Sequence, residues 1–149
     1  MSQTPSGPQP PPALIAEATK RAGHIWIATG GQERPRPAWH IWHAGPGLEP
    51  RGAAYVVTGP GEQPLPGLAA AALVTVIVAG SQTGSGQVTW TADVSEVKPG
   101  SSEWDEVIGP LVAGRLNAVL AEGETSPAQR WARSGAVFRL APAAARQRG

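Results

Sequence analysis

The stretch from Ala53 to Ala79, AAYVVTGPGEQPLPGLAAAALVTVIVA, decides the fold of this chain. It holds two runs rich in β-branched residues, AAYVVT (53–58) and LVTVIVA (73–79), which predict two short strands. The residues between them begin with GPGEQPLPG (59–67), whose glycines and prolines predict a turn-rich loop. This loop contains no Lys or Arg. Two apolar strands joined by such a loop predict part of a small β-rich domain.

Working outward, the same kinds of pattern predict further strands on both sides of this stretch. These strands cover residues 24–29, 38–44, 87–97 and 136–140. Helical spacing of apolar residues predicts helices over 14–22, from a cap at Ser101 or Ser102 to Leu116, and over 127–133. The order is therefore one helix, five strands, two helices and a last strand. Sequential strands with few helices favour a small closed antiparallel barrel over a βαβ sheet.

The composition predicts one domain with polar ends. A chain of 149 residues is about the length of one domain with a sizeable core. Residues 1–12 are rich in Pro, Gln, Ser and Gly and predict a disordered N-terminal tail. The domain is then expected over 13–142, followed by a mobile C-terminal tail over 143–149.

Charge and cysteine content exclude several classes of function. The formal net charge is +1, which does not favour a nucleic-acid binder. There is no cysteine, so disulfides, thiolate catalysis and Cys-based zinc sites are excluded. The longest apolar run, 68–79, is shorter than the roughly 18 residues a membrane helix needs, and no signal-peptide pattern precedes the domain. We therefore expect a cytoplasmic protein that binds neither membranes nor nucleic acid. The heavy use of Ala, Gly, Pro and Arg is typical of a GC-rich bacterial genome.

Several motifs together resemble a known family. Residues 34–42, RPRPAWHIW, resemble its second strand, and 54–59, AYVVTG, resemble its third. Residues 74–78, 88–97 and 138–142 resemble its fourth, fifth and closing strands. In this order, over about 13–142, the chain resembles the flavin-binding split-barrel family of pyridoxamine 5'-phosphate oxidase-like and deazaflavin-using proteins. The resemblance implies a mainly β (α+β) fold, a six-stranded antiparallel split β-barrel with flanking helices.

The resemblance also implies a homodimer with FMN bound between the protomers, or else a deazaflavin, haem or no cofactor. The family places the flavin ring against its second and third strands and the phosphate near the loop after the third strand. By these roles, the expected ring contacts are Trp39, His40 and Ile41, the expected phosphate contacts are Thr58, Gly59 and Gly61, and Arg36 is an expected source of charge.

The loop over 59–67 departs from the family pattern. The family often carries Lys-x-Arg-Asn here, and Pro64 and Pro66 stand at the two cationic positions. Proline has neither a charge nor a backbone N–H for a phosphate. The remaining nearby sources of positive charge are Arg34, Arg36 and Arg51.

Two residue types invite other interpretations. His40 and His43 are three residues apart, so on one strand they point to opposite faces, and we predict no metal site. Trp39 and Trp42 are candidates for stacking on a planar ligand, whereas Trp26, Trp90 and Trp104 are expected in packing.

Two functions remain open from the sequence. One is an oxidoreductase that depends on FMN or a deazaflavin, in which the cofactor carries the redox chemistry. The other is a split-barrel homodimer without a cofactor that acts as a structural or partner-binding module, as the two prolines suggest.

Overall fold

The computed structural model describes residues 9–30, 34–44, 52–59, 62–79, 87–115 and 127–143. Within these ranges the chain forms seven strands and three helices. In chain order they are α1 (Pro12–Arg21), β1 (Ile25–Ala28), β2 (Arg36–Ala38), β3 (Ile41–His43), β4 (Ala53–Thr58), β5 (Leu73–Val78), β6 (Val88–Val97), α2 (Ser102–Gly114), α3 (Pro127–Ser134) and β7 (Ala136–Pro142).

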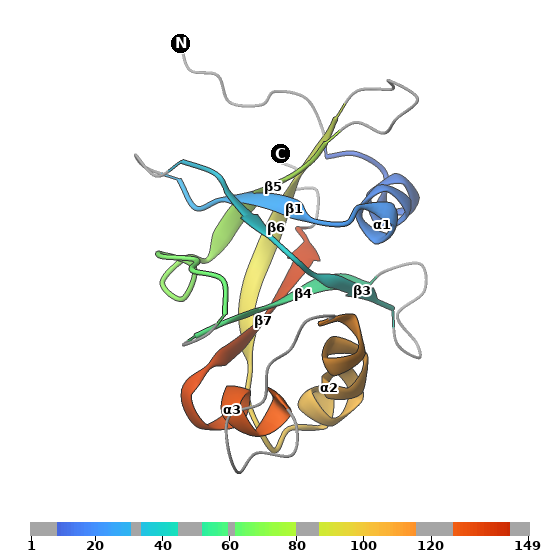
Figure 1. Cartoon of the computed structure of the whole chain (residues 1–149). Coiled ribbons are helices and arrows are strands. Elements are labelled where there is room, and N and C mark those ends of the chain that lie inside the picture. The colour runs from blue at the N-terminus through green and yellow to red at the C-terminus, as the bar shows by residue number, and fades with distance from the viewer. Residues whose placement is uncertain are drawn as a thin grey trace.

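All seven strands belong to one antiparallel sheet, in the order β2-β1-β5-β6-β7-β4-β3 (Figure 1). The ten-residue β6 serves both halves of this sheet. Its residues 88–93 pair with β5, and its residues 92–97 pair with β7. One long strand therefore joins a β2-β1-β5 half to a β7-β4-β3 half, and the sheet curls around it into a split barrel. The predicted fold class is confirmed.

The two edges of the sheet are tied together by the chain itself. β2 and β3 lie at opposite edges, yet only Trp39 and His40 separate them in sequence. The sequence predicted a single strand over 38–44, so the sheet has seven strands where six were expected. The interruption has a physical cause, because the backbone N–H and C=O of Trp39 bond to the side chain of Gln63 and not to a strand.

Apolar residues gather on both faces of the sheet. β4 is buried on both, since Ala54 and Val56 join one cluster and Ala53, Tyr55 and Val57 join the other. This explains why β4 lacks the polar alternation of a half-exposed strand. The first cluster also takes side chains from α1, β1, β5, β6 and the loop before β5, and the second takes side chains from α2 and α3.

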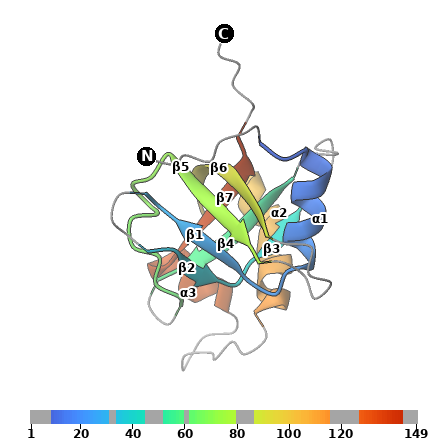
Figure 2. The ribbon, with the colours of Figure 1, turned by 90° about the horizontal axis from the view of Figure 1, so that it is seen from above.

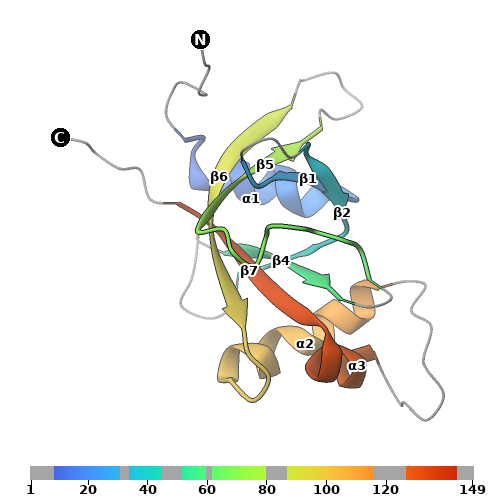
Figure 3. The same cartoon turned by 90° about the vertical axis from the view of Figure 1, so that its left-hand side faces the viewer.

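The helices lie at separate places on the barrel. α1 packs on β3 and β6, α2 packs on β3 and α3, and α3 packs on β7. Figures 1 and 3 show α2 and α3 together at one end, away from α1, and Figure 2 shows α1 from above, at the side of the sheet. The Ser101 hydroxyl caps α2 by accepting from the Trp104 N–H at 3.1 Å, as predicted. No described helix has the length and apolar character needed to cross a bilayer.

Both ends of the described chain meet at β6. The Gln9 side chain accepts from the Thr91 N–H at 2.8 Å and donates to the Thr91 carbonyl at 2.8 Å. It also donates to the carbonyl of Ala143, whose own N–H bonds to the Thr91 carbonyl. Gln9 and Pro12 fall inside the predicted N-terminal tail. Most of both predicted tails, residues 1–8 and 144–149, lies outside the described residues, as does the predicted hairpin loop over 81–86.

Candidate functional site

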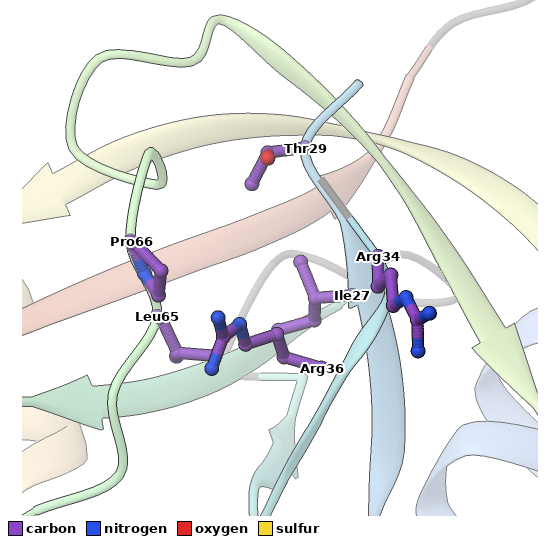
Figure 4. A pocket seen from close by; sticks show the side chains of 6 residues that line it. All are labelled: Ile27, Thr29, Arg34, Arg36, Leu65 and Pro66. Carbon is purple, nitrogen blue, oxygen red and sulfur yellow. The ribbon is translucent and has the colours of Figure 1, made fainter. Parts of the chain in front are cut away.

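A small, shallow cavity, partly open to solvent, lies between β1, the start of β2 and the loop before β5. Figure 4 shows its lining residues, which are Ile27, Thr29, Arg34, Arg36, Leu65 and Pro66. The enclosed space of the cavity is only about that of one water molecule, far below the roughly 300–1,000 Å³ of a typical pocket for a whole small molecule. The cavity can therefore meet a small exposed group of a ligand, such as a phosphate, and does not enclose an entire flavin nucleotide.

Strand pairing and a close loop contact build the walls of the cavity. Arg36 pairs with Ile27 in the β1–β2 register, which places a cation beside a buried apolar side chain. On the other side, Leu65 is buried in the first cluster. Gly67 has φ +88°, and a Cβ there would lie 3.3 Å from the Thr29 hydroxyl oxygen. Glycine thus allows the loop to approach the end of β1.

The cavity is positively charged. Arg34 and Arg36 are both exposed, and neither forms an ion pair with any described residue. None of the described residues that line the cavity is an Asp or a Glu. In Figure 4 the Arg36 guanidinium extends toward Leu65, whereas the Arg34 guanidinium points away from the loop. Arg36 is therefore the cation that already faces the cavity, toward the loop wall formed by Leu65 and Pro66.

Two of the expected phosphate contacts, Thr58 and Gly59, do not line this cavity and have other partners. The Thr58 hydroxyl donates its only proton to the Gln63 carbonyl at 2.9 Å. Gly59 has φ +137°, and a Cβ there would lie 2.6 Å from the Gly135 Cα, so its glycine is explained by close packing of two backbones. Gly61 and Arg51 lie outside the described residues.

Two of the expected ring contacts pack beneath α2 and α3. The Trp39 ring lies 6.2 Å from the Trp131 ring, between centroids, and the Arg115 guanidinium lies 5.8 Å from the Trp39 centroid. The Ile41 side chain is so close to α2 that a Cβ on Gly114 would lie 3.0 Å from it. The protein's own helices therefore contact the side chains that the resemblance assigned to a flavin ring.

His40 faces the opposite way, toward α1. Its Nε2 donates to the Thr19 carbonyl at 2.7 Å, and Trp90 donates to the Thr19 hydroxyl at 3.1 Å. Burial is the main cause that lowers the pKa of His40 below its usual value, and Nδ1 is buried without a hydrogen-bond partner. Trp42 meets Trp90 edge to face, with centroids 6.1 Å apart. As placed, His40 and Trp42 serve the contact between the barrel and α1.

Glu62 is a residue that the sequence analysis missed. Its carboxylate is fully buried and accepts from Arg115 Nε at 2.9 Å, Arg130 Nη2 at 2.8 Å and the Trp131 indole at 2.8 Å. These partners lie at the end of α2 and in α3. A lone Glu in a Gly- and Pro-rich loop has the pattern of a surface residue, so no local signal pointed to this cluster.

A second polar cluster joins β4 to α2. The Tyr55 hydroxyl donates to Glu103 Oε2 at 2.8 Å, and Arg139 Nε lies 3.6 Å from the same oxygen. Burial and then the Glu103 carboxylate raise the pKa of Tyr55 well above its usual value. Nearby, His43 Nε2 lies 3.8 Å from Glu106 Oε2. Across the described ranges, no three His, Asp or Glu side chains gather closely enough to hold a metal.

Comparisons with known proteins agree on the fold. No protein-family model matches the chain, and no curated protein matches its sequence. Among solved structures, the fold is similar to HutZ, the heme storage protein of Vibrio cholerae, with a TM-score of 0.55 and 17% identity over 91% of this chain and 89% of that one.

Two further solved structures are similar. One is a candidate pyridoxamine 5'-phosphate oxidase of Listeria innocua, with a TM-score of 0.53 and 16% identity over 89% of this chain and 94% of that one. The other is a candidate 5-nitroimidazole antibiotic resistance protein of Bacteroides thetaiotaomicron, with a TM-score of 0.52 and 12% identity over 90% and 81%. These likenesses confirm the split-barrel fold that the sequence motifs suggested.

Proposed function

We propose that this protein is a cytoplasmic, homodimeric split-barrel protein that binds a flavin-type cofactor, FMN before a deazaflavin, and serves as an oxidoreductase. The observation that carries this proposal is the cavity in which Arg36 faces Leu65 and Pro66. Similarity in fold to a candidate pyridoxamine 5'-phosphate oxidase and to a heme storage protein supports a cofactor-binding role.

The chemistry of the cavity fits a phosphate group. Guanidinium groups bind phosphate with charge-assisted and often bidentate hydrogen bonds. Arg36 faces the cavity, and the exposed Arg34 has the freedom to turn toward the same anion. In this proposal β2 supplies the positive charge that the loop lacks at Pro64 and Pro66.

The roles of the chain's own residues follow from their positions. Arg36 and Arg34 hold the anionic end, while Ile27 and Leu65 give that end an apolar floor and wall. The cavity does not enclose the rest of a flavin, and in this proposal a second protomer would cover the ring. A bound flavin supplies hydride or electron transfer, and the protein binds and orients it.

Absorption spectroscopy of the purified full-length chain tests the proposal. Bands near 370 and 450 nm, present at purification or shifted on adding FMN, are expected, with riboflavin binding at least about tenfold more weakly because it lacks the phosphate. Arg36→Gln is expected to weaken FMN binding by a similar factor, whereas the control Arg21→Gln on the exposed side of α1 leaves it unchanged. Equal binding of FMN and riboflavin would contradict a phosphate site at Arg36.

The alternative function is a cofactor-free homodimer that acts as a structural or partner-binding module. A specific observation favours it, because Trp39, Ile41 and His40 all contact the protein's own helices. It predicts a colourless dimer by light scattering, with no spectral change and no change in the unfolding temperature on adding excess FMN.

A further inference from the structure

The side chain of Gln63 is bonded to two separate segments of the barrel. Its Oε1 accepts from the Trp39 N–H at 2.8 Å. Its Nε2 donates to the Trp39 carbonyl at 3.3 Å and to the Val57 carbonyl at 3.0 Å. A side-chain amide thus engages both backbone groups of Trp39 at once, as a neighbouring strand would.

The strand register explains why this bond is needed. β3 and β4 pair Ile41 with Tyr55, and continuing that register by two residues would place Trp39 opposite Val57. Trp39 instead turns toward β2 at the other edge of the sheet. Its backbone groups would then be left without a strand partner, and leaving buried groups unpaired is costly. Gln63 supplies the missing partner at the crossing point.

The same side chain connects the two walls of the charged cavity. Gln63 precedes Leu65 by two residues, and Leu65 and Pro66 form the loop wall. Trp39 follows Arg36 by three residues, and Arg36 belongs to the strand wall. The β1–β2 register fixes Arg36 beside Ile27. No other hydrogen bond recorded among the described residues joins the loop wall to the segment that carries Arg36.

We infer that Gln63 is a positioning residue for the anion cavity, because its amide sets the separation between the Arg36 guanidinium and the Leu65–Pro66 wall. The inference rests on the proposed function, since it concerns the same site. A guanidinium must meet phosphate oxygens at hydrogen-bond distance, so a small change in wall separation has a large effect on binding. Gln63 itself does not touch the anion.

The test uses the full-length chain and two probes, inorganic pyrophosphate and FMN. Gln63→Met keeps the length of the side chain and removes all three hydrogen bonds. Gln87→Met is the matched control, because Gln87 is exposed and lies before β6, outside the cavity. Binding is followed by calorimetry and by NMR of the Arg36 Nε–H. Hydrogen–deuterium exchange of the Trp39 amide reports on the Gln63–Trp39 hydrogen bond itself, independently of any ligand.

The expected result is faster exchange of the Trp39 amide in Gln63→Met, with pyrophosphate and FMN both bound roughly tenfold more weakly and Gln87→Met unchanged. Faster exchange with unchanged affinity for pyrophosphate would overturn the inference, as would unchanged exchange. If Gln63→Met does not fold, Gln63→Asn replaces it, because the same amide one methylene shorter cannot reach both Trp39 and Val57.

The results with the two probes distinguish a failure of this inference from a failure of the proposed function. If the wild-type chain binds pyrophosphate but not FMN, the flavin proposal fails, and the effect of Gln63→Met on pyrophosphate still decides the inference. If FMN binds and Gln63→Met leaves its affinity intact, only the inference fails. If wild type binds neither probe, both fail.

Discussion

Gly59 lies where β4 ends against the turn between α3 and β7, and the two backbones there leave no room for a side chain. Its φ is +137°, and a Cβ would lie 2.6 Å from the Gly135 Cα. We expect Gly59→Ala to lower the free energy of unfolding by about 3 kcal/mol, from backbone strain together with the clash. Chemical denaturation followed by Trp fluorescence measures the change.

The matched control for this change is Gly23→Ala, just after α1. A Cβ at Gly23 meets nothing within 4 Å, and its φ does not lie in the left-handed region. Replacing such a glycine with alanine reduces the freedom of the unfolded chain, so we expect a small gain in stability of about 0.4–1 kcal/mol. A Gly59→Ala protein as stable as wild type would show that the close approach to Gly135 does not constrain this turn.

His40 gives the protein a pH-dependent stability. Burial lowers its folded-state pKa, so protonation is easier in the unfolded chain, whose His titrates near pH 6.5. The stabilisation is present above that pH and is lost as pH falls below it, since the unfolded state then binds more protons. Between pH 7.5 and 5, the unfolding temperature should therefore fall less steeply in His40→Gln than in wild type. The charge of His24 also contributes to lowering the pKa of His40, so His24→Gln should make the slope slightly shallower than in wild type, but less so than His40→Gln does.

The hydrogen-bond partner of His40 could not be predicted from the sequence. The resemblance to the flavin-binding family placed His40 beside a flavin ring, because that family sets the ring against the strand expected over 38–44. The structure pairs it with the Thr19 carbonyl, 21 positions earlier in the chain. That partner exists only once α1 has docked on β3 and β6, and no local pattern encodes this docking. Arg36, by contrast, lines the charged cavity, a position consistent with its expected part as a source of charge.

At the scale of elements, Glu62 joins the loop before β5 to α2 and α3. Replacing it with Gln removes the negative charge that Arg115 and Arg130 share in this buried cluster. Breaking a buried ionic cluster from one side costs about 3–5 kcal/mol, and because both arginines keep some exposure we expect a loss of about 3 kcal/mol. Urea denaturation measures it.

The control for this prediction is Glu17→Gln, which removes the exposed i,i+4 pair with Arg21 on α1. Pairs of that kind contribute about 0.3–0.5 kcal/mol. Equal effects of Glu62→Gln and Glu17→Gln on stability would mean that the Glu62 cluster does not hold the loop to the helices.

Element boundaries were predictable wherever the signal is local. The strand expected over 53–58 is the observed β4, and that expected over 73–79 is β5 with one residue fewer. Both are β-branched runs bounded by turn residues. The strand expected over 38–44 is divided at Trp39 and His40, because Gln63, 24 positions away, takes the place of a strand partner. A hydrogen bond between residues so far apart in sequence cannot be predicted from the local sequence pattern.

For the whole molecule, the sheet order predicts a gradient of stability. β6 and β7 are paired on both sides, whereas β2 and β3 are short edge strands. Amides such as those of Val76, Trp90 and Val94 should therefore exchange only through global unfolding, while those of β2 and β3 exchange through local openings. Hydrogen exchange followed by NMR under native conditions tests this. Equal protection throughout the sheet would contradict it.

The fold was more predictable than the candidate site for a physical reason. Local sequence patterns predict the order of strands and helices, and the split-barrel resemblance depended on that order. The charged cavity depends on three segments that meet only in the folded protein, namely 27–29, 34–36 and 65–66. The sequence named Arg34 and Arg36 as available charges, but it carried no signal for which of them faces the loop.

The bonds that Gln9 makes with Thr91 and Ala143 bring the first and last described residues side by side. A short linker from Ala143 back to Gln9 would therefore convert the domain into a closed loop with little distortion. Cutting that loop between Ala79 and Gln87, where β5 passes to β6, would yield a circular permutant with every described strand pairing intact. Such a permutant should fold to the same barrel, because the architecture depends on which strands are neighbours and not on where synthesis of the chain begins.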